Sequence, residues 1–315
     1  MWRIKSVDVK GLLGNFDIHW DLNSHVNILG GSNGSGKSTL LKAIYIQCLP
    51  KDKSDIVVGH SEAIFGIIHS ELNNGFQMNV EKSIKVSEKQ SKEDGKRLLI
   101  GEDISLRIFT HLPEDFSDEG RIGPKVLYIN SMEENTRAMN DMLSNSWLKE
   151  RPATSMLDLL IENRLNERNA IFSDLMSKAI DSGDEKEMKR LQDLFGRFSK
   201  VLKVFMWDYT IQNMANLTFT RTGFHDQSIR YFRLSGGEKQ LIYLLLSIAN
   251  TMGEPTIALL DEADMGMHVD WKRMLLKHML EINPNMQIIA STHSPALIDG
   301  WRNNVKEIGQ LRVNA

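Results

Sequence analysis

The sequence predicts an α/β fold with a mixed central sheet, antiparallel N-terminal strands and a helical lobe inserted in the middle. Three features of the sequence indicate this fold. Apolar residues alternate near the N-terminus, the middle has apolar residues at helical spacing, and two buried-strand patterns follow, each ending in polar residues. The 315 residues suit one core with an insertion. We therefore expect a single domain over 1–315, with the lobe at approximately 131–225.

The N-terminal part is expected to form strands around a glycine-rich loop. Alternating apolar residues predict strands near 4–9, 16–20 and 26–29, and the last of these leads into the loop. The sequence STLLKAIYIQCL then has the spacing of a helix, which ends before Pro50. Further along, KVLYIN at 125–130 predicts a buried strand.

The middle and C-terminal parts change from helix to strand. Residues 156–206 carry two stretches of helical apolar spacing on either side of DSGDE, which predicts a helical hairpin. The absence of a long heptad array argues against an extended coiled-coil arm. After a return to strands near 219–233, PTIALLDEAD and MQIIASTHSP each predict a buried strand followed by polar residues.

Composition excludes several classes of protein. A hydrophobic fraction of 41% and a charged fraction of 25% are ordinary for a globular protein. The net charge of −3 gives no overall basic field for nucleic acid, although a local basic face is compatible with it. With Cys48 as the single cysteine, no intramolecular disulfide forms, which fits a reducing compartment. The apolar runs are too short to span a bilayer, so we expect a cytoplasmic protein without a membrane role.

The glycine-rich loop fits the pattern G-x-x-x-x-G-K-[ST] of phosphate-binding loops. Its glycines allow backbone N–H groups to surround a phosphate, and the next helix adds its positive N-terminal end. Lys37 is expected to reach the β- and γ-phosphates, and Ser38 to hold Mg²⁺. The nucleotide-binding candidates are Gly31, Ser32, Asn33, Gly34, Ser35, Gly36, Lys37, Ser38 and Thr39. Together with its flanking strand and helix, the loop predicts a nucleoside-triphosphate site.

The stretch TIALLDEAD supplies the acidic half of such a site. A buried strand of apolar residues places Asp261 and Glu262 at its carboxyl end, beside the phosphate loop. Asp261 is expected to hold Mg²⁺, largely through water. Glu262 is expected to polarise the attacking water as the catalytic base.

The sequence RLSGGEKQ at 233–240 matches the signature loop of the ABC-type ATPases. A serine and two glycines that open a helix form a second anion site. The candidates in this loop are Ser235, Gly236, Gly237 and Glu238. In the family that the loop resembles, ATP is the nucleotide, and the signature loop of one subunit covers the ATP held by the other. The resemblance therefore implies a head-to-tail homodimer.

Within the ABC-type ATPases, the chain resembles the branch of SMC, RecF and OLD-family proteins. The opening strands before the phosphate loop, the LLDEAD…MHVDW segment and STHSP carry this resemblance. It implies that His293 is the switch histidine that contacts the γ-phosphate, and that Asp264 lies at the dimer interface. The family's glutamine loop has no glutamine here, and Asn130 and Ser131 are the candidate substitutes. This departure affects the expected hydrolysis rate more than ATP binding.

The chain is similar to stand-alone ATPase subunits of Septu-type and retron-associated anti-phage systems. These pair an ATPase with a separate nuclease or toxin. No HNH spacing and no CxxC cluster is present in the sequence, and we expect no room for a C-terminal TOPRIM nuclease. We therefore expect an ATPase that gates a separate effector protein.

Three alternative functions are also compatible with the sequence. A RecF-like repair ATPase would bind duplex DNA through basic residues at 186–203, although Glu187 and Asp193 dilute that charge and favour a solvated helix face. The second alternative is the nucleotide-binding subunit of a transporter, against which STHSP and the opening strands argue. The third is an ATP-dependent scaffold that does not hydrolyse ATP, which the missing glutamine suggests.

Overall fold

The computed structural model describes residues 3–12, 16–48, 66–72, 77–82, 125–130, 155–223 and 228–313. Its α-helices are α1 (Lys37–Cys48), α4 (Met156–Asp181), α5 (Glu185–Phe205), α6 (Gly236–Ala249), α7 (Val269–Ile282) and α8 (Pro295–Ile298). Its strands are β1 (Ile4–Leu12), β2 (Phe16–Asp21), β3 (Val26–Gly30), β4 (Gly66–Leu72), β5 (Gln77–Lys82), β6 (Lys125–Asn130), β7 (Tyr209–Asn213), β8 (Thr218–Arg221), β9 (Ser228–Arg230), β10 (Thr256–Asp261), β11 (Met286–Ser291), β12 (Val305–Glu307) and β13 (Arg312–Val313).

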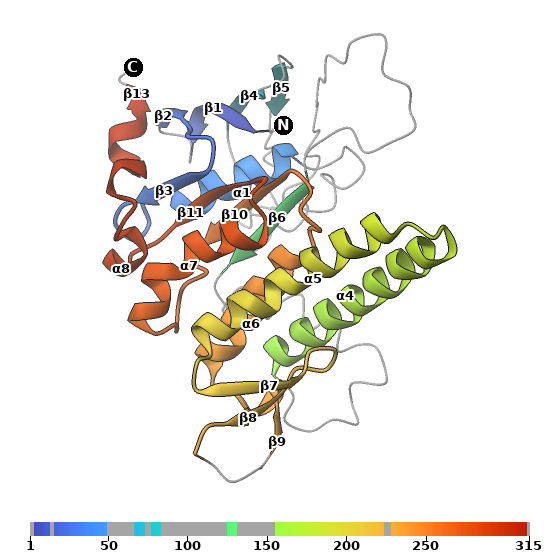
Figure 1. Cartoon of the computed structure of the whole chain (residues 1–315). Coiled ribbons are helices and arrows are strands. Elements are labelled where there is room, and N and C mark those ends of the chain that lie inside the picture. The colour runs from blue at the N-terminus through green and yellow to red at the C-terminus, as the bar shows by residue number, and fades with distance from the viewer. Residues whose placement is uncertain are drawn as a thin grey trace, which may run out of the picture.

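A parallel sheet with the strand order β12-β3-β11-β10-β6 forms the centre of the molecule (Figure 1). The register places Asp261 of β10 opposite Ser291 of β11 and opposite Asn130 of β6. Because the three strands are parallel and in step, their carboxyl ends meet at one edge of the sheet. Ligand sites of open α/β sheets lie at this edge.

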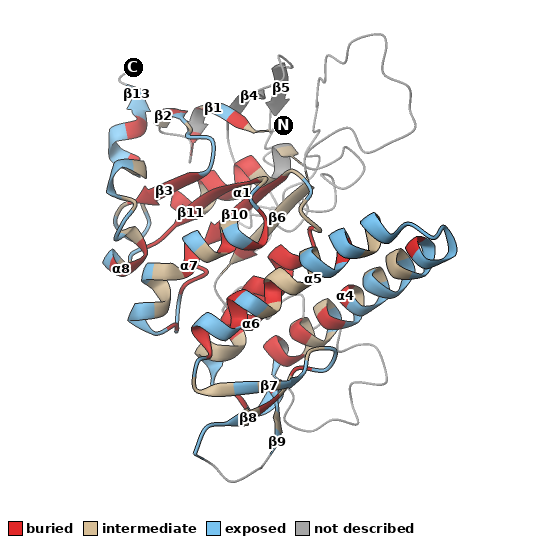
Figure 2. Cartoon of the chain, viewed as in Figure 1, coloured by how far each residue is buried: buried red, intermediate tan, exposed pale blue. Residues whose placement is uncertain are grey.

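The central sheet is buried on both faces. Side chains alternate along β10, so Ile257 and Leu259 join one apolar core while Ala258 and Leu260 join the other. All three strands β3, β10 and β11 are buried along their whole length (Figure 2). Such burial on both faces accounts for the continuous apolar runs that the sequence shows there.

A second, antiparallel sheet confirms the predicted N-terminal strands. Its order is β13-β2-β1-β4-β5, so a strand from the C-terminal part of the chain pairs with β2. Residues of β1, β2 and α1 share a core with Ile289 of β11, and Trp20 is one of its largest buried side chains. Helix α1 thus contacts one face of the parallel sheet and fixes the phosphate loop at its own N-terminus.

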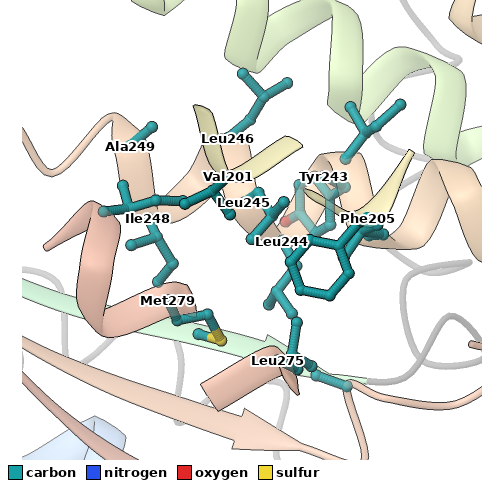
Figure 3. Packing of buried hydrophobic residues seen from close by; sticks show 14 of the residues in the cluster. Val201, Phe205, Tyr243, Leu244, Leu245, Leu246, Ile248, Ala249, Leu275 and Met279 are labelled. Atoms are coloured by element: carbon teal, nitrogen blue, oxygen red, sulfur yellow. The ribbon is translucent and has the colours of Figure 1, made fainter. Parts of the chain in front are cut away.

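The other core lies between the parallel sheet and the helical part of the chain. Helix α6 is buried on almost every side from Gln240 to Ala249. Figure 3 shows its leucines packed against Val201 and Phe205 of α5 and against Leu275 and Met279 of α7. A helix that is apolar all round belongs inside a core, and here α6 connects the lobe to the sheet.

The predicted helical hairpin is confirmed. Ser155 begins α4 in a capping box with Asp158, and Asp184 accepts a hydrogen bond from the Glu187 amide at the start of α5. The hairpin extends from the sheet (Figure 1), and a small antiparallel sheet, β7-β8-β9, follows it. The lobe boundary at 131–225 stays a prediction, because 131–154 lie outside the described residues.

One burial prediction is wrong. We expected KVLYIN to form a buried strand, but β6 is partly exposed, with only Ile129 fully buried. In the described part of the chain, β6 pairs only with β10 and therefore stands at the edge of the sheet. Of the described helices, none has the length and apolar character needed to cross a membrane.

Candidate functional site

The phosphate loop connects β3 to α1 at the carboxyl edge of the parallel sheet. Gly34 and Gly36 adopt φ angles of 73° and 101°, a region that glycine enters without steric cost. A side chain at either position would be strained. The glycines thus allow the loop to adopt this backbone conformation. The loop leads directly into the N-terminus of α1, where free N–H groups favour an anion.

Lys37 bends back over this loop. Its Nζ donates to the carbonyl oxygens of Gly31 at 2.9 Å and Ser32 at 3.0 Å, and it lies 3.0 Å from Nε2 of His293. Only 5% of Lys37 is exposed. The ammonium group is therefore held at the centre of the loop, where a phosphate would meet it.

The hydroxyl of Ser35 is the part of the loop that best fits a phosphate. Among the described residues, its Oγ is buried and has no hydrogen-bond partner. Oγ also lies beside Gly31, where a Cβ atom would come within 3.0 Å of it. A buried hydroxyl without a partner is costly. A phosphate oxygen would provide the missing partner.

Asp261 is surrounded by hydroxyl groups. Its Oδ1 accepts hydrogen bonds from Ser38 at 3.0 Å and from Ser291, and its Oδ2 accepts one from Tyr128 at 3.0 Å. The carboxylate is only 5% exposed. The pair of Ser38 and Asp261 offers the oxygen ligands that Mg²⁺ prefers, so these residues fit the predicted metal site.

Glu262 has a strained backbone. Its φ angle of 51° is unusual for a residue with a side chain, and its amide donates to Ser291 through the carbonyl oxygen at 3.1 Å and Oγ at 3.2 Å. Strain of this kind concentrates at functional sites. The turn directs the Glu262 carboxylate toward His293, whose Nε2 lies 3.3 Å from Oε1.

The structure therefore brings Lys37, Ser38, Asp261, Glu262 and His293 into one cluster. These residues come from the starts or ends of α1, β10 and β11, and the parallel register gathers them. Both catalytic candidates and both metal candidates are in this cluster.

The signature-loop candidates form a second, separate structure. Ser235 begins α6 in a capping box: its Oγ accepts from the Glu238 amide at 3.3 Å, and its own amide donates to Glu238 at 2.7 Å. Tyr209 also donates to Glu238 at 3.0 Å, and burial together with this bond raises the pKa of Tyr209 to about 12. Within the described residues, no hydrogen bond or ion pair joins 235–238 to the phosphate loop at 31–39.

The signature helix instead contacts the loop that follows β10. A Cβ atom on Gly237 would lie 2.4 Å from the carbonyl oxygen of Gly266, so only glycine fits there. Three residues further on, the side chain of Gln240 donates to the Ala263 carbonyl at 3.2 Å. The signature loop and the loop after Asp261 are thus packed together within one chain.

Asp264 and the basic helix have partners within the chain. Asp264 is 4% exposed, pairs with Lys272 at 3.1 Å and accepts from Thr292 at 3.0 Å. On α5, Arg197 and Lys200 both pair with Asp193 at 3.2 and 3.5 Å. Arg190 pairs with Glu187 in the same way. The ion pairs on α5 support its interpretation as a solvated face. The Lys272 ion pair and the Thr292 hydrogen bond hold the Asp264 side chain in place within the chain.

Sequence reasoning missed Ser291 and Tyr128, the two further donors to Asp261. Ser291 lies in the STHSP motif, in which the family resemblance indicates a role for His293 alone. Tyr128 lies in the KVLYIN strand. Side chains alternate along a strand, so Tyr128, two residues before Asn130, faces the same side of the sheet as Asn130. This spacing was the available indication of its role.

Comparison with known proteins identifies the family. Residues 3–310 match the RecF/RecN/SMC N terminal domain, and the chain belongs to this family. The resemblance to the SMC and RecF branch is confirmed. The chain is also 36% identical over 81 residues to the "Retron Vc95 probable ATPase" of Vibrio cholerae serotype O1 biovar El Tor. That match covers 22% of this chain and 16% of the relative.

A solved SMC head structure with a TM-score above 0.5 agrees with the predicted fold. The SmcHead bound to the C-winged helix domain of ScpA has a TM-score of 0.53 and 15% identity, covering 96% of this chain and 93% of that one. An SMC head domain from Thermotoga maritima has a TM-score of 0.48 and 18% identity, covering 94% and 91%. The fold is that of the SMC-head class of P-loop proteins, as predicted.

Proposed function

We propose that this chain binds and hydrolyses ATP with Mg²⁺, closes head to tail with a second copy around the nucleotide, and thereby gates a separate effector in bacterial anti-phage defence. The observation that carries the ATPase part is the cluster at the carboxyl edge of the parallel sheet. There, Lys37, Asp261 and His293 meet from three distant parts of the sequence.

Each residue of the cluster has a chemical role in this proposal. Lys37 holds the β- and γ-phosphates, while the loop amides and the Ser35 hydroxyl complete the phosphate contacts. Ser38 and Asp261 hold Mg²⁺, which when bound neutralises charge on the phosphates. Glu262 accepts a proton from the attacking water, and His293 donates a hydrogen bond to the γ-phosphate.

The homodimer follows from the separation of the two anion sites. Ser235 and Gly236 are exposed at the start of α6, and among the described residues 235–238 make no hydrogen bond or ion pair to the phosphate loop of their own chain. A second copy would bring this helix N-terminus to the phosphates held by the first, where its N–H groups favour negative charge. ATP would then join the two subunits.

The effector and the defence role rest on two similar proteins. One is named a retron probable ATPase, and the other is a structurally similar SMC head that was solved with a domain of a different protein. We therefore propose a separate polypeptide, a nuclease or a toxin, as the partner of this chain. Opening and closing of the ATP dimer would release or hold it.

Native mass tests this proposal. Glu262→Gln would be purified with ATP and Mg²⁺ from cells that carry the neighbouring genes, because this variant should bind ATP without hydrolysing it. We expect a mass above twice 35.9 kDa, with a second polypeptide in the complex. Lys37→Ala is the control: it loses the phosphate contact and should remain monomeric. A bare dimer of Glu262→Gln would contradict effector gating but keep the ATPase proposal.

Hydrolysis itself needs a separate measurement. Asn130 ends β6 directly opposite Asp261, so it occupies the position from which a glutamine loop would start. Turnover well above that of Glu262→Gln would support an ATPase. Turnover equal to that of the variant would favour an ATP-dependent scaffold. Steeply salt-dependent binding to duplex DNA would favour the repair alternative instead.

A further inference from the structure

Tyr128 connects the edge strand of the central sheet to Asp261. Its hydroxyl donates to Oδ2 of Asp261 at 3.0 Å, across 133 positions of sequence. The ring of Tyr128 also packs on that of Tyr45 in α1, with the ring centroids 5.2 Å apart and the planes at 32°. Tyr128 therefore touches the helix that follows the phosphate loop as well as the strand that ends in Asp261.

Strand pairing explains why Tyr128 reaches this carboxylate. In the parallel register, Tyr128 lies opposite Leu259, and Asn130 lies opposite Asp261. Alternation places Leu259 and Asp261 on the same face of β10, which is the face that α1 covers. Tyr128 lies on this same face, packed against the core that contains Leu259, and a tyrosine is long enough to reach the end of the neighbouring strand.

The two oxygens of Asp261 have different donors. Oδ1 accepts from Ser38 and Ser291, whereas among the described residues it is Tyr128 that reaches Oδ2. Asp261 is almost completely buried, so solvent does not readily replace a lost donor. The Tyr128 bond thus fixes the rotation of the carboxylate and decides which lone pairs remain for other contacts.

We propose that Tyr128 is a positioning residue that orients the Asp261 carboxylate for Mg²⁺. The inference rests on the proposed function, in which Asp261 and Ser38 hold the metal. Tyr128 acts through Asp261 and does not touch the nucleotide. Residues that orient metal ligands in this way typically change metal affinity by about ten- to a hundredfold when they are altered.

The ratio of nucleotide affinities with and without metal tests the proposal. Binding of a non-hydrolysable ATP analogue would be measured in EDTA and in Mg²⁺ for wild type and Tyr128→Phe. The variant keeps the ring on Tyr45 and loses only the hydroxyl. We define the metal-dependent gain as the factor by which Mg²⁺ raises the affinity for the analogue over its affinity in EDTA. For Tyr128→Phe we expect unchanged affinity in EDTA and a metal-dependent gain that is smaller by about tenfold. Tyr45→Phe loses the hydroxyl of the stacked partner ring and should retain the full gain.

A double-mutant cycle with Asp261→Asn shows whether Tyr128 acts through this carboxylate. In the Asp261→Asn background, Tyr128→Phe should lower the gain no further. The inference is overturned if the gain of Tyr128→Phe stays within twofold of the wild-type gain, or if its affinity falls equally in EDTA and in Mg²⁺. It is also overturned if the effects of Tyr128→Phe and Asp261→Asn on the gain are additive. Wild-type protein that binds no nucleotide at all would instead overturn the proposed function, and this inference with it.

Discussion

Nζ of Lys37 lies 3.0 Å from Nε2 of His293, a residue 256 positions further along the chain. The same Nε2 lies 3.3 Å from Oε1 of Glu262. A ring nitrogen without a proton accepts from Lys37, whereas one with a proton donates to Glu262, so it serves one neighbour at a time. A phosphate that takes the Lys37 ammonium would release His293 for a different contact. His293 thus stands between the group that binds phosphate and the group that activates water.

This relationship predicts that His293→Ala separates binding from hydrolysis. Lys37 keeps its two carbonyl acceptors in the variant, so ATP affinity should stay within about threefold of wild type, while turnover falls by about a hundredfold or more. Dissociation constants and turnover would be measured in parallel. His25→Ala, an exposed histidine away from the cluster, is the control. An equal loss of affinity and turnover would show that His293 mainly supports the loop.

The parts of this site that could be predicted are those whose residues lie close together in the sequence. The phosphate loop, Asp261 and Glu262 were predicted because each motif is local and each follows a strand whose carboxyl end faces the same sheet edge. Tyr128 and Asp261 meet only through the register of two distant strands, which no local pattern gives. The edge position of β6 has the same origin, because burial of a strand depends on which neighbours the sheet supplies.

The loop after β10 shows a second limit of sequence reasoning. The family resemblance implies that Asp264 lies at a dimer interface, which stays a prediction. The resemblance does not indicate the partners of this side chain within its own chain, where the carboxylate is buried against Lys272 and Thr292. Lys272 stands on α7, and Thr292 follows β11. Only the packed structure shows that these two side chains converge on Asp264.

Gly237 provides a matched test of how the signature loop is held. In Gly237→Ala, the new Cβ atom would meet the Gly266 carbonyl oxygen at 2.4 Å, and a backbone atom does not move aside cheaply. We expect a loss of about 1–3 kcal/mol in the free energy of unfolding, together with weaker ATP-dependent dimerisation. Chemical denaturation and native mass would measure the two effects.

Gly236→Ala is the control for this variant, because a Cβ atom at Gly236 meets nothing within 4 Å. It should stay within about 0.5 kcal/mol of wild type. Equal stability of the two variants would show that the contact between Gly237 and Gly266 does not constrain the loop.

Ser235→Arg tests the head-to-tail dimer. Ser235 is exposed and, among the described residues, makes no hydrogen bond to its own phosphate loop, so a long cation there should leave ATP binding by the monomer intact. At a dimer interface the same side chain would block closure. Light scattering with ATP and Mg²⁺ should therefore show monomers in a hydrolysis-deficient background that otherwise dimerises.

Two controls separate blockage from damage to the helix cap. Ser235→Asn keeps an oxygen that caps α6 and should still dimerise. Ser182→Arg places the same cation at the exposed turn between α4 and α5, away from the signature loop, and should dimerise as well. A dimer that persists in Ser235→Arg would rule out closure through this loop.

The rate at which Cys48 is alkylated should depend on pH differently in the folded and the unfolded protein. It is the single cysteine of the chain and ends α1 half-buried against the core of the antiparallel sheet, where burial raises the pKa of its thiol from 9.0 to about 12. The reactive species is the thiolate. At pH 7.5, alkylation of the folded protein should therefore be about a thousandfold slower than that of the unfolded chain, since each pH unit is a factor of ten.

The sign of the pH effect follows from the raised pKa. The folded state favours the protonated thiol, so this contribution to stability is complete below pH 9.0 and is lost as the pH rises toward about 12. The alkylation rate of the folded protein should keep increasing across this range, whereas that of the unfolded chain levels off near pH 9.0. Cys48→Ala gives the background rate. A folded rate within tenfold of the unfolded rate at pH 7.5 would show that the thiol is accessible to solvent and ionises normally.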